Sequence, residues 1–262
     1  MSGGRGEGGP PLRYAVEAGI ARLTLDRPEK RNALDGELVR ALRDGLARAA
    51  ADETVRVVAL SGAGPDFCSG ADLAELERIS TLSEEENLAD ARSLGALFGQ
   101  MRAHPRPIVA LVHGRALAGG CGLATACDVV LARADAEFGY PEVHLGFVPA
   151  LVMTILRRKV GEGRAFELVA AGERFGAGEA HRLGLVTRVY EPFTFGAEAG
   201  KYLAALAGKP ASAVTLTKKL LYELDGLDFE AGMDRAAQVN VEARMTDACR
   251  EGVRRFLDKS RG

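Results

Sequence analysis

The chain has 262 residues, of which 47% are hydrophobic and 27% are charged, and its formal net charge is −2. These values are typical of a globular protein and exclude the strongly basic surface of a dedicated nucleic-acid-binding protein. No apolar stretch approaches the roughly 18 residues that cross a bilayer, and the Gly-rich start contains no signal segment. We therefore expect a cytoplasmic protein without nucleic-acid or membrane partners, with a disordered tail over residues 1–11.

The first predicted elements alternate between strand and helix. Alternating apolar residues from Tyr14 to Leu25 predict one half-buried strand, which ends before Pro28. Helical spacing predicts a helix over residues 34–50 with Asp35 as its N-cap. The later expected elements, in chain order, are a strand over 55–60, a helix over 81–101 capped by Ser83, a strand over 108–112, a helix ending at Ala126, a strand over 129–132, helices over 152–160, 163–171 and 177–183, and a strand over 186–189.

The pattern changes near Gly196, after which only helical spacing appears. The expected helices cover residues 197–207, 211–224, 229–245 and 247–257. We therefore predict an α/β core over residues 12–195 and a helical region over residues 196–262.

Two turns between a strand and a helix are candidates for binding a ligand through backbone N–H groups. In Phe67–Leu73 (FCSGADL), Gly70 allows a sharp turn, and the Ala71 N–H is expected at or near a helix start. The second turn, Gly114–Leu123 (GRALAGGCGL), opens another helix, and no Lys follows it as in a phosphate-binding loop. Ordinary strand–helix packing is the alternative for each turn. Together they could hold one carbonyl oxygen, and losing one such donor typically raises a barrier by about 2.7–4 kcal/mol.

A third candidate is the irregular segment Phe138–Gly146 (FGYPEVHLG). Glu142 is an acid among apolar neighbours, and burial would raise its pKa toward the range that suits proton transfer. A surface glutamate is the alternative. We expect His144, between Val143 and Leu145, to be structural rather than a second base.

These segments, taken in order, resemble the crotonase family, also called the enoyl-CoA hydratase/isomerase superfamily. The resemblance runs from about Leu12 to Lys259. It is carried by DRPEKRNALD (26–35), DFCSGADL (66–73), HGRALAGGCGLATACD (113–128), FGYPEVHLGFVP (138–149) and AGERFGAGEAHRLGLVTRV (171–189). The resemblance implies a crotonase-like α/β spiral of ββα units with a C-terminal helical region. It also implies homotrimers, which often pair into hexamers, with the helical region over residues 196–262 serving oligomerisation and closure over coenzyme A.

The resemblance assigns roles to the three candidate segments. It places the oxyanion hole, which holds the thioester oxygen, on the N–H groups of Ala71 and Gly119. Hydratases of the family use two glutamates; one position falls on Glu142, and the other falls on Gly122, where this sequence departs from the pattern. With one carboxylate, water is held less firmly, at a cost of about a few kcal/mol, whereas moving a double bond needs only one base.

The resemblance also implies a site for coenzyme A, which is part of the substrate, so that no separate cofactor is expected. RNAL (31–34) corresponds to the turn that holds the pantetheine and adenine end, and Phe256 and Lys259 correspond to residues that reach the nucleotide of a neighbouring subunit. A solvated last helix is the alternative for that pair. The expected substrate-binding residues are Arg31, Ala33, Leu34, Ser69, Gly70, Asp72, Leu73, Gly120, Gly122, Pro141, Phe256 and Lys259. The four histidines lack ligand spacing, so no metal site is expected.

The leading hypothesis is an enoyl-CoA hydratase that acts on 2-enoyl-CoA thioesters. A Δ3,Δ2-enoyl-CoA isomerase with Glu142 as its sole base is the alternative within the fold. Thioester hydrolysis or C–C bond chemistry would be a further variation. A non-catalytic acyl-CoA-binding protein is the alternative from another class. We expect the acyl group to lie between a helix over residues 75–97 and the segment after Gly146, which contains Phe147, Val148 and Leu151.

Overall fold

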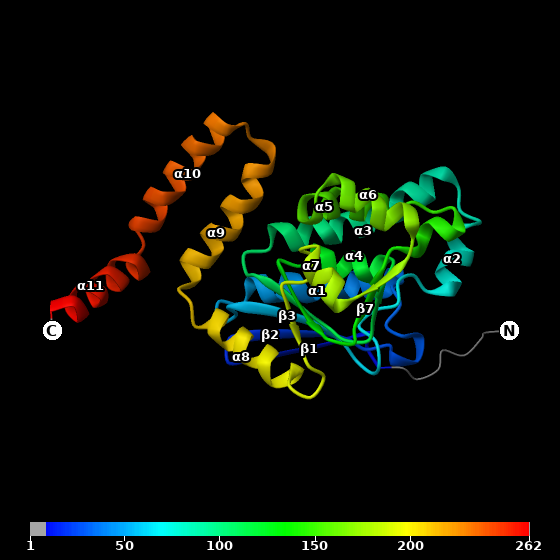
Figure 1. The fold of residues 1–262 in the computed structure, drawn as a ribbon, viewed down its shortest axis with the longest axis horizontal. Coiled ribbons are helices and arrows are strands. Elements are labelled where there is room, and N and C mark those ends of the chain that lie inside the picture. Colours follow the sequence, from blue (N-terminus) through cyan, green and yellow to red (C-terminus); the bar gives the residue numbers. More distant parts are fainter. Residues whose placement is uncertain (1–8, 262) are drawn as a thin grey trace.

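The computed structural model describes residues 9–261 and contains two sheets surrounded by helices (Figure 1). The larger sheet has the strand order β1-β2-β3-β4-β6-β9, in which only the pairing of β1 with β2 is antiparallel. Its strands are β1 (Leu12–Glu17), β2 (Ile20–Leu25), β3 (Val57–Gly62), β4 (Ile108–Val112), β6 (Val129–Arg133) and β9 (Arg188–Tyr190). The smaller sheet consists of β5 (Arg115–Leu117), β7 (Glu137–Gly139) and β8 (Arg174–Gly176).

The helices occupy most of the chain between the strands and all of its C-terminal part. They are α1 (Gly36–Ala51), α2 (Leu73–Ile79), α3 (Glu84–Ala103), α4 (Gly119–Ala126), α5 (Ala150–Val160), α6 (Glu162–Ala171), α7 (Ala177–Arg182), α8 (Phe195–Ala207), α9 (Ala211–Glu223), α10 (Phe229–Arg244) and α11 (Asp247–Arg261). Asp35 caps α1, and Ser83 with Glu86 forms a capping box at α3, as the sequence predicts. No described helix is both long enough and apolar enough to cross a membrane.

Three features of the fold differ from the sequence-based expectations. The single strand expected over 14–25 is a hairpin, because Ala18 and Gly19 both have positive φ angles, 49° and 77°, and reverse the chain. The helix expected over 75–97 is two helices, since α2 ends at Ile79 and Ser83 starts α3. The three-residue strands β5, β7 and β8 are too short to produce a periodic signal, and the sequence analysis missed them.

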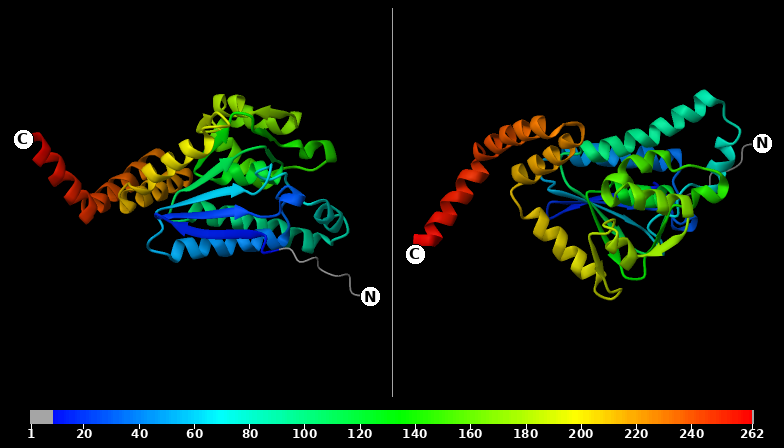
Figure 2. Two further views of the ribbon diagram at one scale, coloured as in Figure 1. Left: turned by 90° about the horizontal axis from the view of Figure 1, so that it is seen from below. Right: turned by 45° about the horizontal axis from the view of Figure 1, so that its top comes forward.

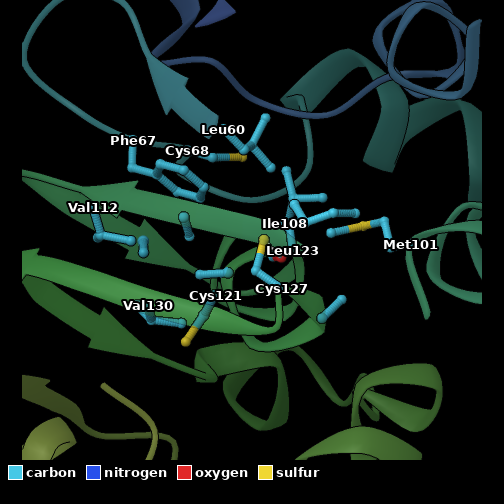
Figure 3. Packing of buried hydrophobic residues seen from close by; sticks show 14 of the residues in the cluster. Leu60, Phe67, Cys68, Met101, Ile108, Val112, Cys121, Leu123, Cys127 and Val130 are labelled. Atoms are coloured by element: carbon cyan, nitrogen blue, oxygen red, sulfur yellow. Dashed lines mark hydrogen bonds between the residues drawn. The ribbon is translucent and has the colours of Figure 1, made fainter. Parts of the chain in front are cut away.

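The core lies mainly on one face of the larger sheet. Side chains of β3, β4 and β6 point there toward Leu123 and Cys121 of α4 and toward Met101 of α3 (Figure 3). On the other face, Val57, Val109 and other strand residues pack against Leu203 of α8. Because both faces are covered, the parallel strands are apolar almost throughout.

The C-terminal helices leave the core after α9. In both views of Figure 2, α10 and α11 reach away from the sheet, with the C-terminus far from β1. The disordered tail expected over residues 1–11 stays a prediction, because residues 1–8 lie outside the described part, and β1 begins at Leu12. From Phe195 onward the described chain forms helices only, so the division near Gly196 follows a change in architecture.

Candidate active site

The segment from Cys68 to Asp72 is held between two other parts of the chain. On one side, Cys68 N–H donates to Arg115 O at 3.0 Å, and Leu117 N–H donates to Cys68 O at 3.0 Å. On the other side, Leu34 N–H donates to Gly70 O at 2.6 Å, and Asp72 N–H donates to Leu34 O at 3.0 Å. These bonds fix the backbone between β5 and the RNAL turn.

This ladder also fixes the direction of the Ala71 N–H. In a trans peptide the N–H points opposite to the preceding carbonyl, and Gly70 O is directed at Leu34. The Ala71 N–H therefore points away from the RNAL turn, and it donates to no other described residue. Ala71 lies near a helix start, as expected, because it directly precedes Asp72, the N-cap of α2, which begins at Leu73. The bridge to Leu34, rather than a helix, orients this amide.

The Gly119 N–H lies at the start of α4. Ala118 O accepts from Gly122 N at 2.9 Å, so the Gly119 N–H points out of the helix, and it has no partner among the described residues. Ala118 has a φ of 48°, an unusual value for a residue with a side chain. Its N–H donates to Gly139 O at 2.9 Å, which ties the start of α4 to β7.

The two candidate turns are in direct contact at Gly70. A methyl group placed on Gly70 would lie 2.8 Å from Ala118 Cβ and 3.7 Å from Gly119 N, and the φ of Gly70 is 104°. A methyl group on Gly120 would lie 2.2 Å from Cys68 O. Glycine is therefore required at both positions, and the two partnerless amides lie on adjoining backbone segments.

A partly buried arginine, Arg27, also supports the first turn. Arg27 Nη2 lies 2.8 Å from Asp35 and 2.9 Å from Asp72, the N-caps of α1 and α2, and Arg27 Nη1 donates to Ala33 O at 2.6 Å. Burial raises the pKa of Asp72, but bonds from Lys30, Ala74 N and Arg27 outweigh it, and the pKa is lowered overall. The sequence analysis missed Arg27 as a support, because its partners lie up to 45 residues away.

Glu142 lies in a short 3-10 helix, Pro141–Leu145, in which Pro141 occupies the first turn. Its Oε2 atom is buried and has no hydrogen-bond partner in the described chain. Burial raises the pKa of the carboxyl, although the residue's own N–H partly opposes this. Burial is the main reason why the pKa of the Cys121 thiol in α4 is raised to about 12. The Glu142 carboxyl is near enough to add to this increase.

A buried hydrogen-bond chain connects the Glu142 turn to α4. Thr125 Oγ1 donates to Cys121 O at 2.7 Å, so the Thr125 oxygen accepts from the Tyr140 hydroxyl, also at 2.7 Å. Tyr140 is fully buried, and burial raises its pKa well above the ordinary value. Glu142 is therefore held against the helix that starts with Gly119. The sequence analysis did not identify Tyr140 or Thr125, since only their meeting in space gives them this role.

Gly122 lies one turn after Gly119 and faces helix α5 and helix α3. A Cβ atom at this position would lie 2.4 Å from Val152 Cγ2 and 3.6 Å from the Phe98 ring. Val152 and Phe98 are both buried. Apolar side chains occupy the space into which a side chain at residue 122 would project.

The structure brings together the predicted substrate-binding residues of the segments 31–34, 69–72 and 119–120. Arg31 and Asn32 have positive φ angles of 51° and 55°, and the buried Asn32 amide holds the turn by donating to Ala63 O and Asp66 O at 2.8 Å. Phe256 and Lys259 lie on α11, far from the RNAL turn of the same chain (Figure 1). The Leu73 side chain lies outside the described residues.

The surroundings of the site correct one further expectation. Phe147 and Val148 are 47% and 72% exposed, so in the single chain they do not form a buried pocket wall, whereas Leu151 packs against the core. The His144 ring Nε2 lies 3.2 Å from Gly172 O, which ties the Glu142 turn to the end of α6 and agrees with a structural histidine.

The sheet order, the helical C-terminal region and the two adjoining turns define a protein of the crotonase fold. The family model for enoyl-CoA hydratase/isomerase matches residues 15–262. The chain therefore belongs to the enoyl-CoA hydratase/isomerase family of enzymes.

Two relatives and one solved structure illustrate the similarity. A Thermus thermophilus protein with a provisional description as an enoyl-CoA hydratase is 43% identical over 93% of this chain and 97% of its own length. The crotonyl-CoA hydratase of Syntrophomonas wolfei is 33% identical over 93% of each chain. The crystal structure of a Mycobacterium smegmatis enoyl-CoA hydratase, 33% identical, superimposes with a TM-score of 0.91 and covers 96% of this chain and 97% of that one.

Proposed function

We propose that the protein is a hydratase of 2-enoyl-CoA thioesters in which Glu142 is the acid/base. The observation that carries the proposal is the Oε2 atom of Glu142, which is buried beside α4 and, like the Gly119 N–H that opens this helix, has no partner among the described residues. The Ala71 and Gly119 N–H groups would donate to the thioester oxygen and stabilise the negative charge that develops there. The names of the relatives support a substrate of this class.

In the proposed reaction, the Glu142 carboxylate takes a proton from water as the water oxygen bonds to the β-carbon. The C=C electrons move toward the thioester, and the resulting enolate oxygen is held by the two amides. Glu142 then returns the proton to the α-carbon, the carbonyl re-forms, and a 3-hydroxyacyl-CoA results. The raised pKa of Glu142 suits a group that must both take up and release a proton.

The second candidate is the isomerisation of 3-enoyl-CoA to 2-enoyl-CoA. The apolar contact of Gly122 with Val152 and Phe98 favours it, because no second carboxylate is available there to hold water. Glu142 would then remove a proton from the α-carbon and return it to the γ-carbon. Parallel assays with 2-enoyl-CoA and 3-enoyl-CoA separate the two activities.

Replacement of Glu142 tests both candidates. Glu142→Gln should lower the turnover of the active substrate by about 10²–10⁴-fold, since it removes the proton carrier and keeps the shape. Glu137→Gln is the matched control: this exposed carboxyl makes only long ion pairs, at 3.8 Å, and its loss should leave turnover unchanged. Full activity in Glu142→Gln would exclude the assigned role. Tight acyl-CoA binding without turnover in the unmodified protein would favour the non-catalytic alternative.

The assembly and the coenzyme A site are part of the same proposal. The RNAL turn, with Arg31 58% exposed at its side chain, would receive the coenzyme A end of the substrate. Exposed apolar residues on α10 and α11, including Phe229, Met233 and Phe256, support a homotrimer or hexamer in which Lys259 reaches a neighbouring copy. Sedimentation analysis measures the mass of the assembly directly. A cytoplasmic location remains a proposal.

A further inference from the structure

Val152 packs so closely on Gly122 that it restricts which residues fit at position 122. Gly122 is buried in the middle of α4. A Cβ atom placed on Gly122 would lie 2.4 Å from a methyl carbon of Val152, which is the nearest atom of another element. Real Cβ atoms do not approach other atoms so closely, so any larger residue at 122 requires movement. Val152 itself is in α5 and buried, and a β-branched residue in a helix has one strongly preferred rotamer.

The same contact lies on the catalytic side of α4. Residues three apart in a helix share a face, so Gly122 faces the same way as Gly119, whose free amide opens the helix. The ring of Phe98 in α3 also lies 3.6 Å from the Gly122 Cβ position. Around Gly122, the region beside the proposed thioester site is therefore lined by carbon atoms of Val152 and Phe98. The carboxyl comes from Glu142 in the 3-10 helix Pro141–Leu145.

We propose that Val152 and Gly122 form a matched pair that fixes the number of acid groups at the site at one. Val152 is a specificity-determining residue, because its methyl group occupies the volume that a second carboxylate would need and leaves water without a second acceptor. The pair thereby leaves Glu142 as the single carboxylate that can hold water, which slows hydration more than it slows proton shuttling within the acyl chain. This inference rests on the proposed function, since it concerns the ratio of hydration to isomerisation at the same site.

A stability cycle tests the packing half of the inference and needs no activity. The four proteins are the wild type, Gly122→Ala, Val152→Ala and the double variant, each unfolded by heat. In an unhindered helix interior, Gly→Ala is stabilising. We expect Gly122→Ala to lower the midpoint by about 4 °C or more in the wild type and to lower it much less, or raise it, with Val152→Ala. Equal shifts in both backgrounds would overturn the matched pair.

An activity cycle tests the catalytic half. Gly122→Glu alone should fold poorly or gain no hydration, because the new side chain meets Val152. Gly122→Glu combined with Val152→Ala should hydrate 2-enoyl-CoA at least about tenfold faster than Val152→Ala alone, and its ratio of hydration to isomerisation should rise. If the double variant folds, retains isomerisation and shows no gain in hydration, the inference is overturned. If Gly122→Glu alone gains as much hydration as the double variant, it is overturned as well.

The proposed function and the matched pair can be refuted separately. A wild-type protein that converts neither 2-enoyl-CoA nor 3-enoyl-CoA refutes the proposed function, and the stability cycle still decides whether Val152 excludes a side chain at residue 122. If the wild type is active and the midpoint shifts of Gly122→Ala and Val152→Ala add in the double variant, the matched pair is refuted. The proposed function is then unaffected.

Discussion

At the scale of single residues, the Glu142 carboxyl is held in an environment that disfavours its charge. Its Oε2 atom is buried without a partner in the described chain, and burial raises the pKa. A carboxyl whose pKa is higher in the folded state than in the unfolded state, about 4.3 for Glu, binds more protons when folded. The free energy of unfolding therefore increases as the pH falls through the folded pKa.

This gives a prediction that is independent of activity. As the pH falls from 7 toward 4.5, the wild type should gain stability relative to Glu142→Gln, which cannot titrate, until the unfolded pKa is reached. Urea unfolding of both proteins at several pH values measures the difference. A difference that is constant with pH would contradict a raised pKa of Glu142 in the folded state.

The sequence identified the residues that carry a motif and missed those that act through a distant partner. Glu142, Ala71 and Gly119 stand in recognisable segments, so their positions could be predicted. Arg27 bonds Asp72 across 45 residues, and Val152 matters only because it packs on Gly122. Such pairings depend on tertiary contacts, for which a single sequence carries no local signal.

At the scale of elements, the site depends on how the Glu142 turn is attached to α4. Gly139 O accepts from Ala118 N, and the Tyr140 hydroxyl bonds Thr125. Long elements such as α1 and α3 were predicted from periodicity and caps. The attachment itself was not, because β5 and β7 have three residues each and their pairing is set by distant partners.

Removing the Tyr140 hydroxyl should loosen this attachment without removing a group from the reaction. For Tyr140→Phe we expect a fall in kcat of about tenfold with little change in KM, because Glu142 is less well placed. The thermal midpoint should fall by only a few degrees, since one buried hydrogen bond contributes about 1 kcal/mol. Tyr14→Phe is the control, because the buried Tyr14 hydroxyl has no partner among the described residues. An unchanged kcat in Tyr140→Phe would refute the positioning role.

At the scale of the whole molecule, one buried ion pair joins the C-terminal helices to the core. Lys218 of α9, with a side chain 7% exposed, lies 2.8 Å from Asp128, which also accepts from Tyr222 at 2.6 Å and from Ile108 N at 2.6 Å. Burial lowers the pKa of Lys218, and the Asp128 charge opposes that shift. Asp128 thus links the start of β4 to α9, and α10 and α11 continue beyond it (Figure 2).

Breaking this pair should destabilise the protein far more than breaking its exposed neighbour. Lys218→Met leaves the Asp128 charge buried and should cost about 3–5 kcal/mol. Lys219→Met removes a largely exposed partner of Glu223 at 3.8 Å and should change stability by at most about 0.5 kcal/mol. Urea unfolding compares the two variants, and similar losses would refute Asp128 as the anchor of α9.

The central claim is that the Ala71 and Gly119 amides receive one thioester oxygen while Glu142 faces the neighbouring carbons. The most direct test is a crystal structure of Glu142→Gln with a bound 2-enoyl-CoA. The account predicts that both amide nitrogens lie about 2.7–3.1 Å from the thioester oxygen, with the substituted side chain at position 142 beside the α- and β-carbons. A thioester oxygen bound away from either amide, or an acyl chain remote from residue 142, would contradict it.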